Sequence, residues 1–443
     1  MELLILAIVI IVIIVATVKF HVHPVFSLTV AGIVCGLCFG LTPKVVMTTL
    51  SDGFGKTLSG IGLVIAFGTI IGTFLEKTHG TTVLANSILK GVGLKRSPLA
   101  LNLSGLVISI PVYCDSGFVI LSSLNRALSK RSGVKMAVFA IALATGLYSA
   151  HVFVPPTPGP LAAAAILEAD LGLVMLFGLV IAIFVSVAGY AWARIIGPKI
   201  TLEACDEESE TSLTLSEEEV VLPNLLQTLL PIVLPLVLIA LRSIAEYPSH
   251  PFGEGVLANT ASFLGNPIVA LFIGVVLCFI LLGKGRSRAK QAWVSESLKQ
   301  AGSIVLITGA GGAFGAILRT LDFESLLNIG TVSGAEGLLL AFGIAAVLKT
   351  AQGSSTVAII TTAAIVAPLL STFALESTVD KALAVLAIGA GAMTVSHVND
   401  SYFWVVAEFS KMDMKTALRG HTVATLIQGF VGIAMVVLFY FII

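Results

Sequence analysis

His23-Pro24-Val25 begins an apolar run, and Asn266-Pro267-Ile268 begins another run at an offset of 243 residues (267 − 24). A second pattern keeps the same offset: Gly68-x-x-x-Gly72-x-x-Leu75 returns as Gly311-x-x-x-Gly315-x-x-Leu318. Two matches in one order at one spacing predict that the chain consists of two related halves.

A third match adds a feature to each half. Ala150-His151-Val152 returns as Ser396-His397-Val398, and in both places the apolar pattern then breaks. A duplicated apolar chain with an interrupted segment in each half is typical of secondary transporters.

The composition predicts a polytopic membrane protein. The chain is 57% hydrophobic and 11% charged, whereas soluble domains carry about 25% charged residues. Many of its apolar runs approach the roughly 20 residues that cross a bilayer. The first run, residues 3–18, lacks a basic leader and a cleavage site, so it is expected to be a retained helix. A net charge of zero and the lack of a basic aromatic patch argue against nucleic acid as a partner.

Each half contains six apolar runs. In the first half they are residues 3–18, 25–41, 61–75, 98–128, 136–167 and 171–196. In the second half they are residues 225–240, 267–282, 304–318, 337–373, 383–409 and 416–443. The fourth run of each half is interrupted by small and polar residues, at 113–117 and at 351–356. Such a run either crosses the membrane or turns back as a re-entrant hairpin.

The basic residues favour the hairpin. If both interrupted runs turn back, most of the 25 Lys and Arg residues fall on one side of the membrane. Six then remain on the other side: Lys44, Lys56, Arg242, Arg319, Lys349 and Lys381. The predicted fold is therefore all-α, with two repeats of five transmembrane helices and one re-entrant hairpin each. An odd number of crossings makes the repeats inverted, with both termini periplasmic and the hairpin tips meeting near the midplane.

The repeats set the expected domain boundaries. Residues 1–200 form the first repeat and residues 223–443 form the second. Residues 201–222 between them contain many carboxylates from Glu203 to Glu219, which indicates a solvated cytoplasmic linker.

Four irregular segments are expected at membrane depth, where protein or a water-filled cavity must cover unpaired backbone groups. Two are the hairpin tips. The others are breaks at residues 151–160, which include four prolines, and at residues 396–401. Half-helices that end at such breaks direct their positive N-terminal dipole ends at the gap, which suits an anion.

The predicted site gathers at these segments, because intramembrane charges are costly and indicate function. Residues expected to bind an anionic substrate are Ser116, Thr157, Lys349, Gln352, Ser354, Ser355, Thr356, Asn399 and Ser401. Residues expected to handle protons are Asp115, His151, His397 and Asp400. Structural alternatives stay open: Asp115 and Lys349 neutralise each other, Asp400 caps a half-helix, or the histidines bond backbone carbonyls.

An enzyme is the competing class of function. Ser354 has no nucleophile elbow around it, and His151 and His397 have no second metal ligand at helical spacing. We therefore expect no catalytic residues, no metal and no cofactor.

The chain resembles the gluconate permease family of gluconate:H⁺ symporters, within the ion transporter superfamily. The resemblance rests on Ala351-Gln352-Gly353-Ser354-Ser355-Thr356-Val357-Ala358, on Ser396-His397-Val398-Asn399-Asp400-Ser401-Tyr402-Phe403-Trp404, and on His151 followed by Pro155-Pro156-Thr157-Pro158. It implies proton-driven import of small sugar acids or hydroxy acids across a bacterial inner membrane. It further implies a homodimer with an elevator-type motion, in which residues 1–96 and 223–334 form the scaffold and residues 97–200 and 335–443 form the transport domain.

Two departures from the family pattern bear on the substrate. In the pattern of gluconate-type members, Glu-Val-Gly stands where this chain has Asp115-Ser116-Gly117. A His stands where this chain has Thr157. Gluconate, a smaller hydroxy acid such as glycerate, and D-serine all stay open as substrates. Sodium in place of the proton stays open as well.

Overall fold

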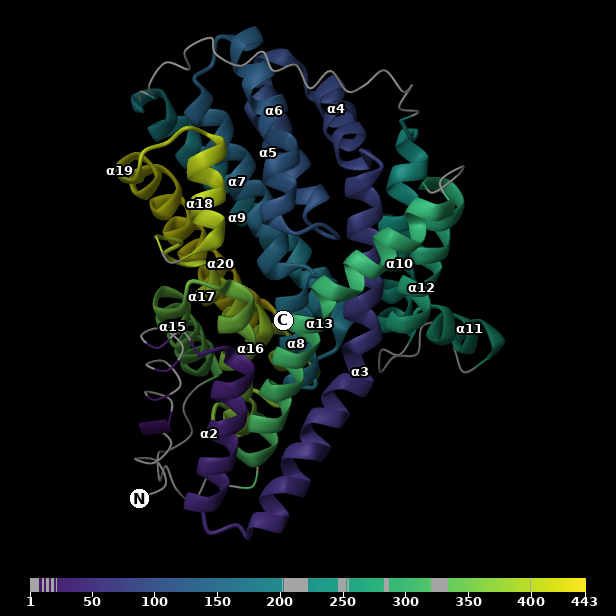
Figure 1. Cartoon of the computed structure of the whole chain (residues 1–443), viewed down its shortest axis with the longest axis vertical. Coiled ribbons are helices and arrows are strands. Elements are labelled where there is room, and N and C mark those ends of the chain that lie inside the picture. The colour runs from purple at the N-terminus through teal and green to yellow at the C-terminus, as the bar shows by residue number, and fades with distance from the viewer. Residues whose placement is uncertain are drawn as a thin grey trace.

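The described part of the chain is helical throughout and contains no strand (Figure 1). The computed structural model describes residues 8, 9, 12, 16, 20, 22–200, 202, 222–245, 252, 255–282, 287–318, 320, 334–398 and 400–443. Most of the expected first run at 3–18, most of the 201–222 linker and Asn399 lie outside these residues.

The helices of the first half are α2 (Pro24–Cys38), α3 (Pro43–Lys77), α4 (Gly80–Val92), α5 (Ser97–Ile108), α6 (Cys114–Ser132), α7 (Met136–Phe153), α8 (Pro158–Ile166) and α9 (Leu171–Ile196). Those of the second half are α10 (Leu225–Ala245), α11 (Val256–Leu264), α12 (Pro267–Leu277), α13 (Ser287–Leu318), α15 (Gly334–Gln352), α16 (Ser355–Val366), α17 (Thr378–Met393), α18 (Ser401–Phe409), α19 (Met414–Ala417) and α20 (Val423–Ile442). Short π-helical segments at Cys278–Leu282 and Leu418–Thr422 adjoin α12 and α20.

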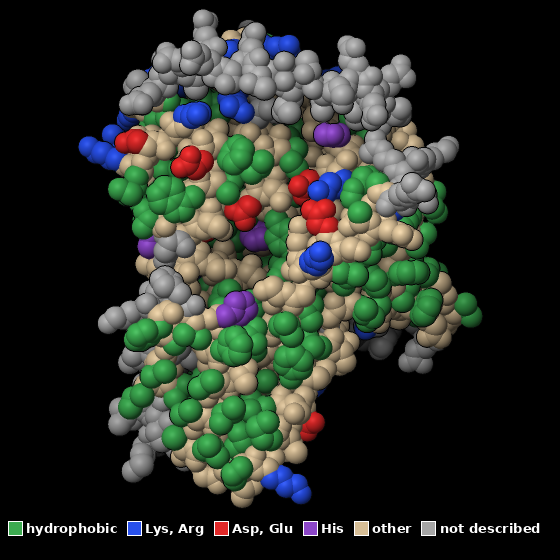
Figure 2. Space-filling model, in the orientation of Figure 1, with side chains coloured by type: hydrophobic (Ala, Val, Ile, Leu, Met, Phe, Trp, Pro, Cys, Tyr) green, Lys and Arg blue, Asp and Glu red, His purple; other side chains and the backbone are tan. Residues whose placement is uncertain are grey.

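Six of the described helices are long and apolar enough to cross a membrane, or up to eight if each bent pair is one span. Large hydrophobic side chains are exposed on many of the described apolar helices, among them Phe26 of α2, Phe184 of α9 and Phe430 of α20. Figure 2 shows such side chains spread over the lower part of one face, where few charges appear. A surface of this kind suits contact with lipid. The ten predicted crossings stay a prediction.

Several of the described helices differ from the expected runs. α3 begins at Pro43, well before the expected Ile61, because the Thr42 side chain caps its N-terminus and proline suits the first helical turn. This helix bends by 43° between Gly60 and Gly62. The helices α4 and α11 were not expected, because α4 is only moderately apolar and α11 is only nine residues long.

Each interrupted run folds into two antiparallel helices. Leu101, near the start of α5, shares a small apolar cluster with Leu128, near the end of α6. In the second half, a Cβ on Gly337 at the start of α15 would contact Phe373 and Leu375, which follow α16. The chain therefore reverses direction at residues 109–113 and again at residues 353–354. Entry of these hairpins into a bilayer stays a prediction.

The two breaks lie where they were predicted. α7 ends at Phe153 and α8 begins at Pro158, while α17 ends at Met393 and α18 begins at Ser401. α7 holds the centre of this region: its residues 137–153 are all buried, and it packs against α5, α6, α9 and α17. A helix buried on all sides positions its polar side chains rigidly.

The repeated glycine pattern lets two long helices approach the hairpins. A Cβ on Gly72 of α3 would lie 2.2 Å from the carbonyl oxygen of Pro111, in the turn of the first hairpin. On α13, a Cβ on Gly311 would lie 2.7 Å from Ile360 of α16, in the second hairpin. These glycines therefore allow close packing through small residues, with the hairpins as the partners.

This contact predicts the effect of one substitution. Gly72→Val places methyl groups against a backbone carbonyl, and overpacking of this kind costs about 1–3 kcal/mol. We expect a lower melting temperature for the purified variant, measured by intrinsic fluorescence. Gly62→Val is the matched control, because Gly62 lies in the same helix and its Cβ would meet nothing within 4 Å. Equal melting temperatures for the two variants would contradict the close approach.

Candidate functional site

A buried ion pair joins the second hairpin to the break between α17 and α18. Lys349, in the last turn of α15, places its Nζ 2.7 Å from Oδ2 of Asp400. The Lys349 side chain is 0% exposed and the Asp400 side chain is 5% exposed. Removing one partner of such a pair leaves an uncompensated charge and costs about 3–5 kcal/mol. The arrangement therefore demands a reason beyond stability.

Among the described residues, Asp400 accepts hydrogen bonds from three donors, of which Lys349 is one. The backbone N–H of Tyr402 donates to Oδ1 at 3.0 Å, so Asp400 also caps α18. The Ser396 hydroxyl donates to Oδ2 at 2.5 Å, beside Lys349. These contacts fix the carboxylate at the N-terminus of a half-helix, where the helix dipole favours its negative charge.

Ser396 is itself held by the segment that leads into α20. Its backbone N–H donates to Thr425 Oγ1 at 3.0 Å, and its carbonyl oxygen accepts a hydrogen bond from the Thr422 hydroxyl. Nε2 of His421 lies 3.2 Å from the Ser396 hydroxyl. His421 is fully buried and belongs to the π-helical segment Leu418–Thr422. Single π-turns of this kind occur frequently at functional sites.

α7 supplies an aromatic wall on the other side. The Tyr148 hydroxyl lies 2.9 Å from the Ser355 hydroxyl, at the start of α16. The His151 ring stacks on Tyr148 with an interplanar angle of 15° and a centroid distance of 6.5 Å. The Tyr402 hydroxyl donates to the Ala144 carbonyl at 2.9 Å and so ties α18 to α7.

Several buried polar atoms around this wall have no hydrogen-bond partner among the described residues. They are Oδ1 of Asp115, Nδ1 of His151, Oε1 of Gln352 and Nδ1 of His421. Asp115, His151 and His421 each interact electrostatically with Asp400. Buried polar atoms are normally paired, so unpaired ones gathered at one place are expected to meet water, a ligand or a proton.

The structure brings together most of the predicted residues, with different surroundings. Lys349 and Asp400 pair directly, so Lys349 does not pair with Asp115. The predicted alternative that Asp400 caps a half-helix is also observed, together with the ion pair. His397 Nε2 lies 2.9 Å from the Thr350 carbonyl oxygen, which matches the carbonyl-bonded alternative for this histidine.

The predicted hydroxyls occupy several environments. Ser354 caps α16 through the N–H of Val357, and the Thr157 hydroxyl donates to the Val154 carbonyl at 2.6 Å. Ser116 and Thr356 are half-buried, and Ser401 is exposed. Asn399 lies outside the described residues.

Sequence reasoning missed Tyr148, Ser396 and His421 as site residues. Ser396 stood in a quoted motif, but its small side chain carries no charge to single it out. His421 offered a signal, because it is an ionisable residue within the apolar run 416–443. Its distance from the breaks along the chain concealed its contact with Ser396. Among the described residues, no group of three or more His, Cys, Asp and Glu could hold a metal.

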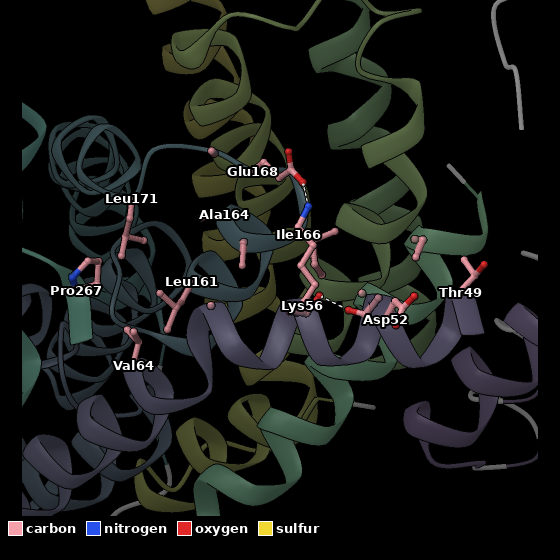
Figure 3. Close-up of a pocket in the computed structure, with 18 residues that line it drawn as sticks. Thr49, Asp52, Lys56, Val64, Leu161, Ala164, Ile166, Glu168, Leu171 and Pro267 are labelled. Atoms are coloured by element: carbon pink, nitrogen blue, oxygen red, sulfur yellow. Dashed lines mark hydrogen bonds and ion pairs between the residues drawn. The ribbon is translucent and has the colours of Figure 1, made fainter. Parts of the chain in front are cut away.

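A separate cavity of about 590 Å³ lies between α3, α8 and α13 (Figure 3). Its polar lining includes Asp52, Lys56 and Glu168, and Lys56 Nζ lies 2.7 Å from Glu168 Oε1. Both side chains of this ion pair are exposed, so it contributes little to stability. No predicted site residue lines this cavity. A much smaller one, beside Gly68, Tyr113 and Thr157, reaches the first hairpin turn.

Known proteins resemble this chain over nearly its whole length. Residues 1–442 match the family described as GntP family permease. An uncharacterised permease of Haemophilus influenzae is 34% identical over 436 residues, covering 94% of this chain and 88% of the relative. A gluconate permease of Pseudomonas aeruginosa is 31% identical, covering 95% and 93%. The D-serine transporter DsdX of Escherichia coli is 31% identical, covering 98% and 97%.

A solved structure shares the fold. The YdaH transporter of Alcanivorax borkumensis superposes with a TM-score of 0.64 at 15% identity, covering 90% of this chain and 88% of that one. The family resemblance predicted from the motifs at residues 351–358 and 396–404 is confirmed by the match over residues 1–442. This chain is therefore a multi-pass membrane permease of the GntP family, a transporter rather than an enzyme.

Proposed function

We propose that this permease imports a small hydroxylated carboxylate by proton symport across the bacterial inner membrane. The observation that carries the proposal is the buried Lys349–Asp400 ion pair with unpaired polar atoms of Asp115, His151 and Gln352 around it. A lysine in this position supplies the positive charge that a substrate carboxylate needs. Two acids nearby supply sites for the proton.

The relatives support the substrate class. Gluconate and D-serine, the substrates in two relatives' names, are both hydroxylated and both carry a carboxylate. Lys349 suits the carboxylate, and the hydroxyls of Ser354, Ser355 and Thr356 suit substrate hydroxyls. The Asp115 and Thr157 side chains are shorter than the Glu and His that the pattern of gluconate-type members has at these two positions. This difference changes how far the polar groups reach into the site, so a smaller hydroxy acid such as glycerate suits it as well as gluconate.

We further propose that the two halves are inverted repeats whose hairpins are re-entrant, with both termini periplasmic. The antiparallel arms of both hairpins and the two helix breaks support this arrangement. In the proposed homodimer, residues 1–96 and 223–334 form the scaffold. Residues 97–200 and 335–443 form the transport domain, which moves as an elevator along α3 and α13.

An uptake assay tests the proposed substrate and the proposed coupling ion. In proteoliposomes with an inward proton gradient and no sodium, we expect accumulation of radiolabelled D-glycerate or gluconate. The control is the Lys349→Gln/Asp400→Asn double variant, because removing both charges together avoids an unpaired buried charge. We expect this variant to fold and to accumulate neither acid. Accumulation that requires sodium, or that is confined to D-serine, would contradict the proposal and favour the corresponding alternative.

A cross-linking experiment tests the proposed motion of the transport domain relative to the scaffold. Lys56 lies on the proposed scaffold and Glu168 on the proposed transport domain, beside the 590 Å³ cavity (Figure 3). In a background without the native cysteines, we expect a short bifunctional thiol reagent to cross-link Lys56→Cys to Glu168→Cys and to stop uptake. A reducible reagent allows recovery to be measured in the same sample.

The matched controls are the two single-cysteine variants, which the reagent modifies without forming a cross-link. Uptake at the uncross-linked rate in a fully cross-linked sample would show that α8 does not move against α3. The elevator would then be excluded, while carboxylate transport by another motion would stand.

A further inference from the structure

A chain of polar contacts leads from His421 to Lys349. His421 Nε2 contacts the Ser396 hydroxyl at 3.2 Å, this hydroxyl donates to Asp400 Oδ2 at 2.5 Å, and the same oxygen accepts from Lys349 Nζ at 2.7 Å. All four side chains are at most 5% exposed. Nδ1 of His421 is a buried atom with no hydrogen-bond partner among the described residues. This nitrogen, at the end of the series of contacts, is therefore available to accept a proton.

Resting on the proposed symport, we propose that His421 and Ser396 relay the transported proton to Asp400, and that this proton frees Lys349 to bind the substrate carboxylate. The steps balance. A proton arrives at Nδ1 of His421, the Nε2 proton passes to the Ser396 oxygen, and the hydroxyl proton of Ser396 passes to Asp400 Oδ2. The imidazole is neutral again afterwards, with its proton on Nδ1 instead of Nε2. Rotation of the His421 ring and of the Ser396 hydroxyl restores the starting hydrogen-bond pattern.

The charges explain why the two ligands bind together. With Asp400 ionised, its carboxylate occupies Lys349 and the pair is neutral. A substrate anion that entered then would add an unpaired negative charge in a buried site, which is costly. Once Asp400 is protonated, Lys349 carries an uncompensated positive charge that the substrate carboxylate neutralises. The pair is thus neutral both when empty and when loaded, so proton and anion cross together.

Other ionisable groups, on α6, α7 and α18, lie near this series of polar contacts. They are Cys114 and Asp115 of α6, Tyr148 and His151 of α7, and Tyr402 of α18. Asp115 is the competing proton acceptor, since it also interacts with Asp400. Among the described residues, Asp115 forms no hydrogen bond or ion pair with Lys349, whose partner is Asp400, so a proton on Asp115 does not by itself release Lys349.

The experiment compares two activities of the same proteoliposomes. Net uptake driven by a proton gradient requires protonation and deprotonation in each cycle, whereas exchange of internal for external D-glycerate at equal pH does not. His421→Gln keeps a side-chain amide that donates to Ser396 but passes no proton. We expect net uptake to fall at least about tenfold, as for loss of a proton-transfer group, with exchange close to the wild-type rate.

Asp400→Asn provides the second variant. We expect it to exchange D-glycerate without accumulating it, and to bind D-glycerate with an affinity that no longer changes with pH. Ser396→Ala should behave like His421→Gln, and Ser396→Thr, which keeps the hydroxyl, should recover net uptake.

Three results would overturn the relay. One is wild-type net uptake and an unchanged pH profile in His421→Gln. Another is parallel loss of uptake and exchange in His421→Gln with an unchanged melting temperature, which would give His421 a role in binding. The third is uncoupled exchange in Asp115→Asn but not in Asp400→Asn. If the wild-type protein neither exchanges nor accumulates D-glycerate or gluconate, the proposed function itself fails, and this outcome is distinct from the three others.

Discussion

The Lys349–Asp400 ion pair is the interaction on which the rest of the site depends. It joins α15 of the second hairpin to the first turn of α18, two segments that otherwise end in irregular backbone. Two opposite charges buried this deeply contribute little net stability compared with apolar residues of the same size. Their presence is therefore better explained by a step in which the pair opens. A buried pair that opens needs a proton or an anion to replace each lost partner, and the proposed transport supplies both.

The surrounding structure packs closely around the segments that carry the pair. α7 is buried along its whole length and presents Tyr148 and His151 to the pair from one side. Glycines on α3 and α13 bring the long helices against the hairpins at distances that admit no Cβ at Gly72 or Gly311. The 590 Å³ cavity beside Lys56 lies at the same boundary between α3 and α8.

The sequence was sufficient to predict the helical class, the two hairpins' turns and the two breaks, because each leaves a local mark. Prolines at 155, 156, 158 and 160 forbid a continuous helix, and polar residues at 113–117 and 351–356 interrupt apolar runs. Charged residues at membrane depth identified Lys349 and Asp400 for the same reason. Their mutual contact was not predicted, because the pairing of side chains 51 residues apart is set by packing rather than by local pattern. The roles of Ser396 and His421 in the site were not predicted for the same reason. Helices α4 and α11 were not predicted because they are short.

A cryo-EM structure of the purified permease with a bound hydroxy acid at low pH would show most directly whether the Lys349–Asp400 pair opens for the substrate. We predict that the substrate carboxylate lies within hydrogen-bonding distance of Lys349 and that Asp400 no longer contacts the lysine. A structure with the acid seated in the cavity between α3, α8 and α13, and with the Lys349–Asp400 pair intact, would contradict it.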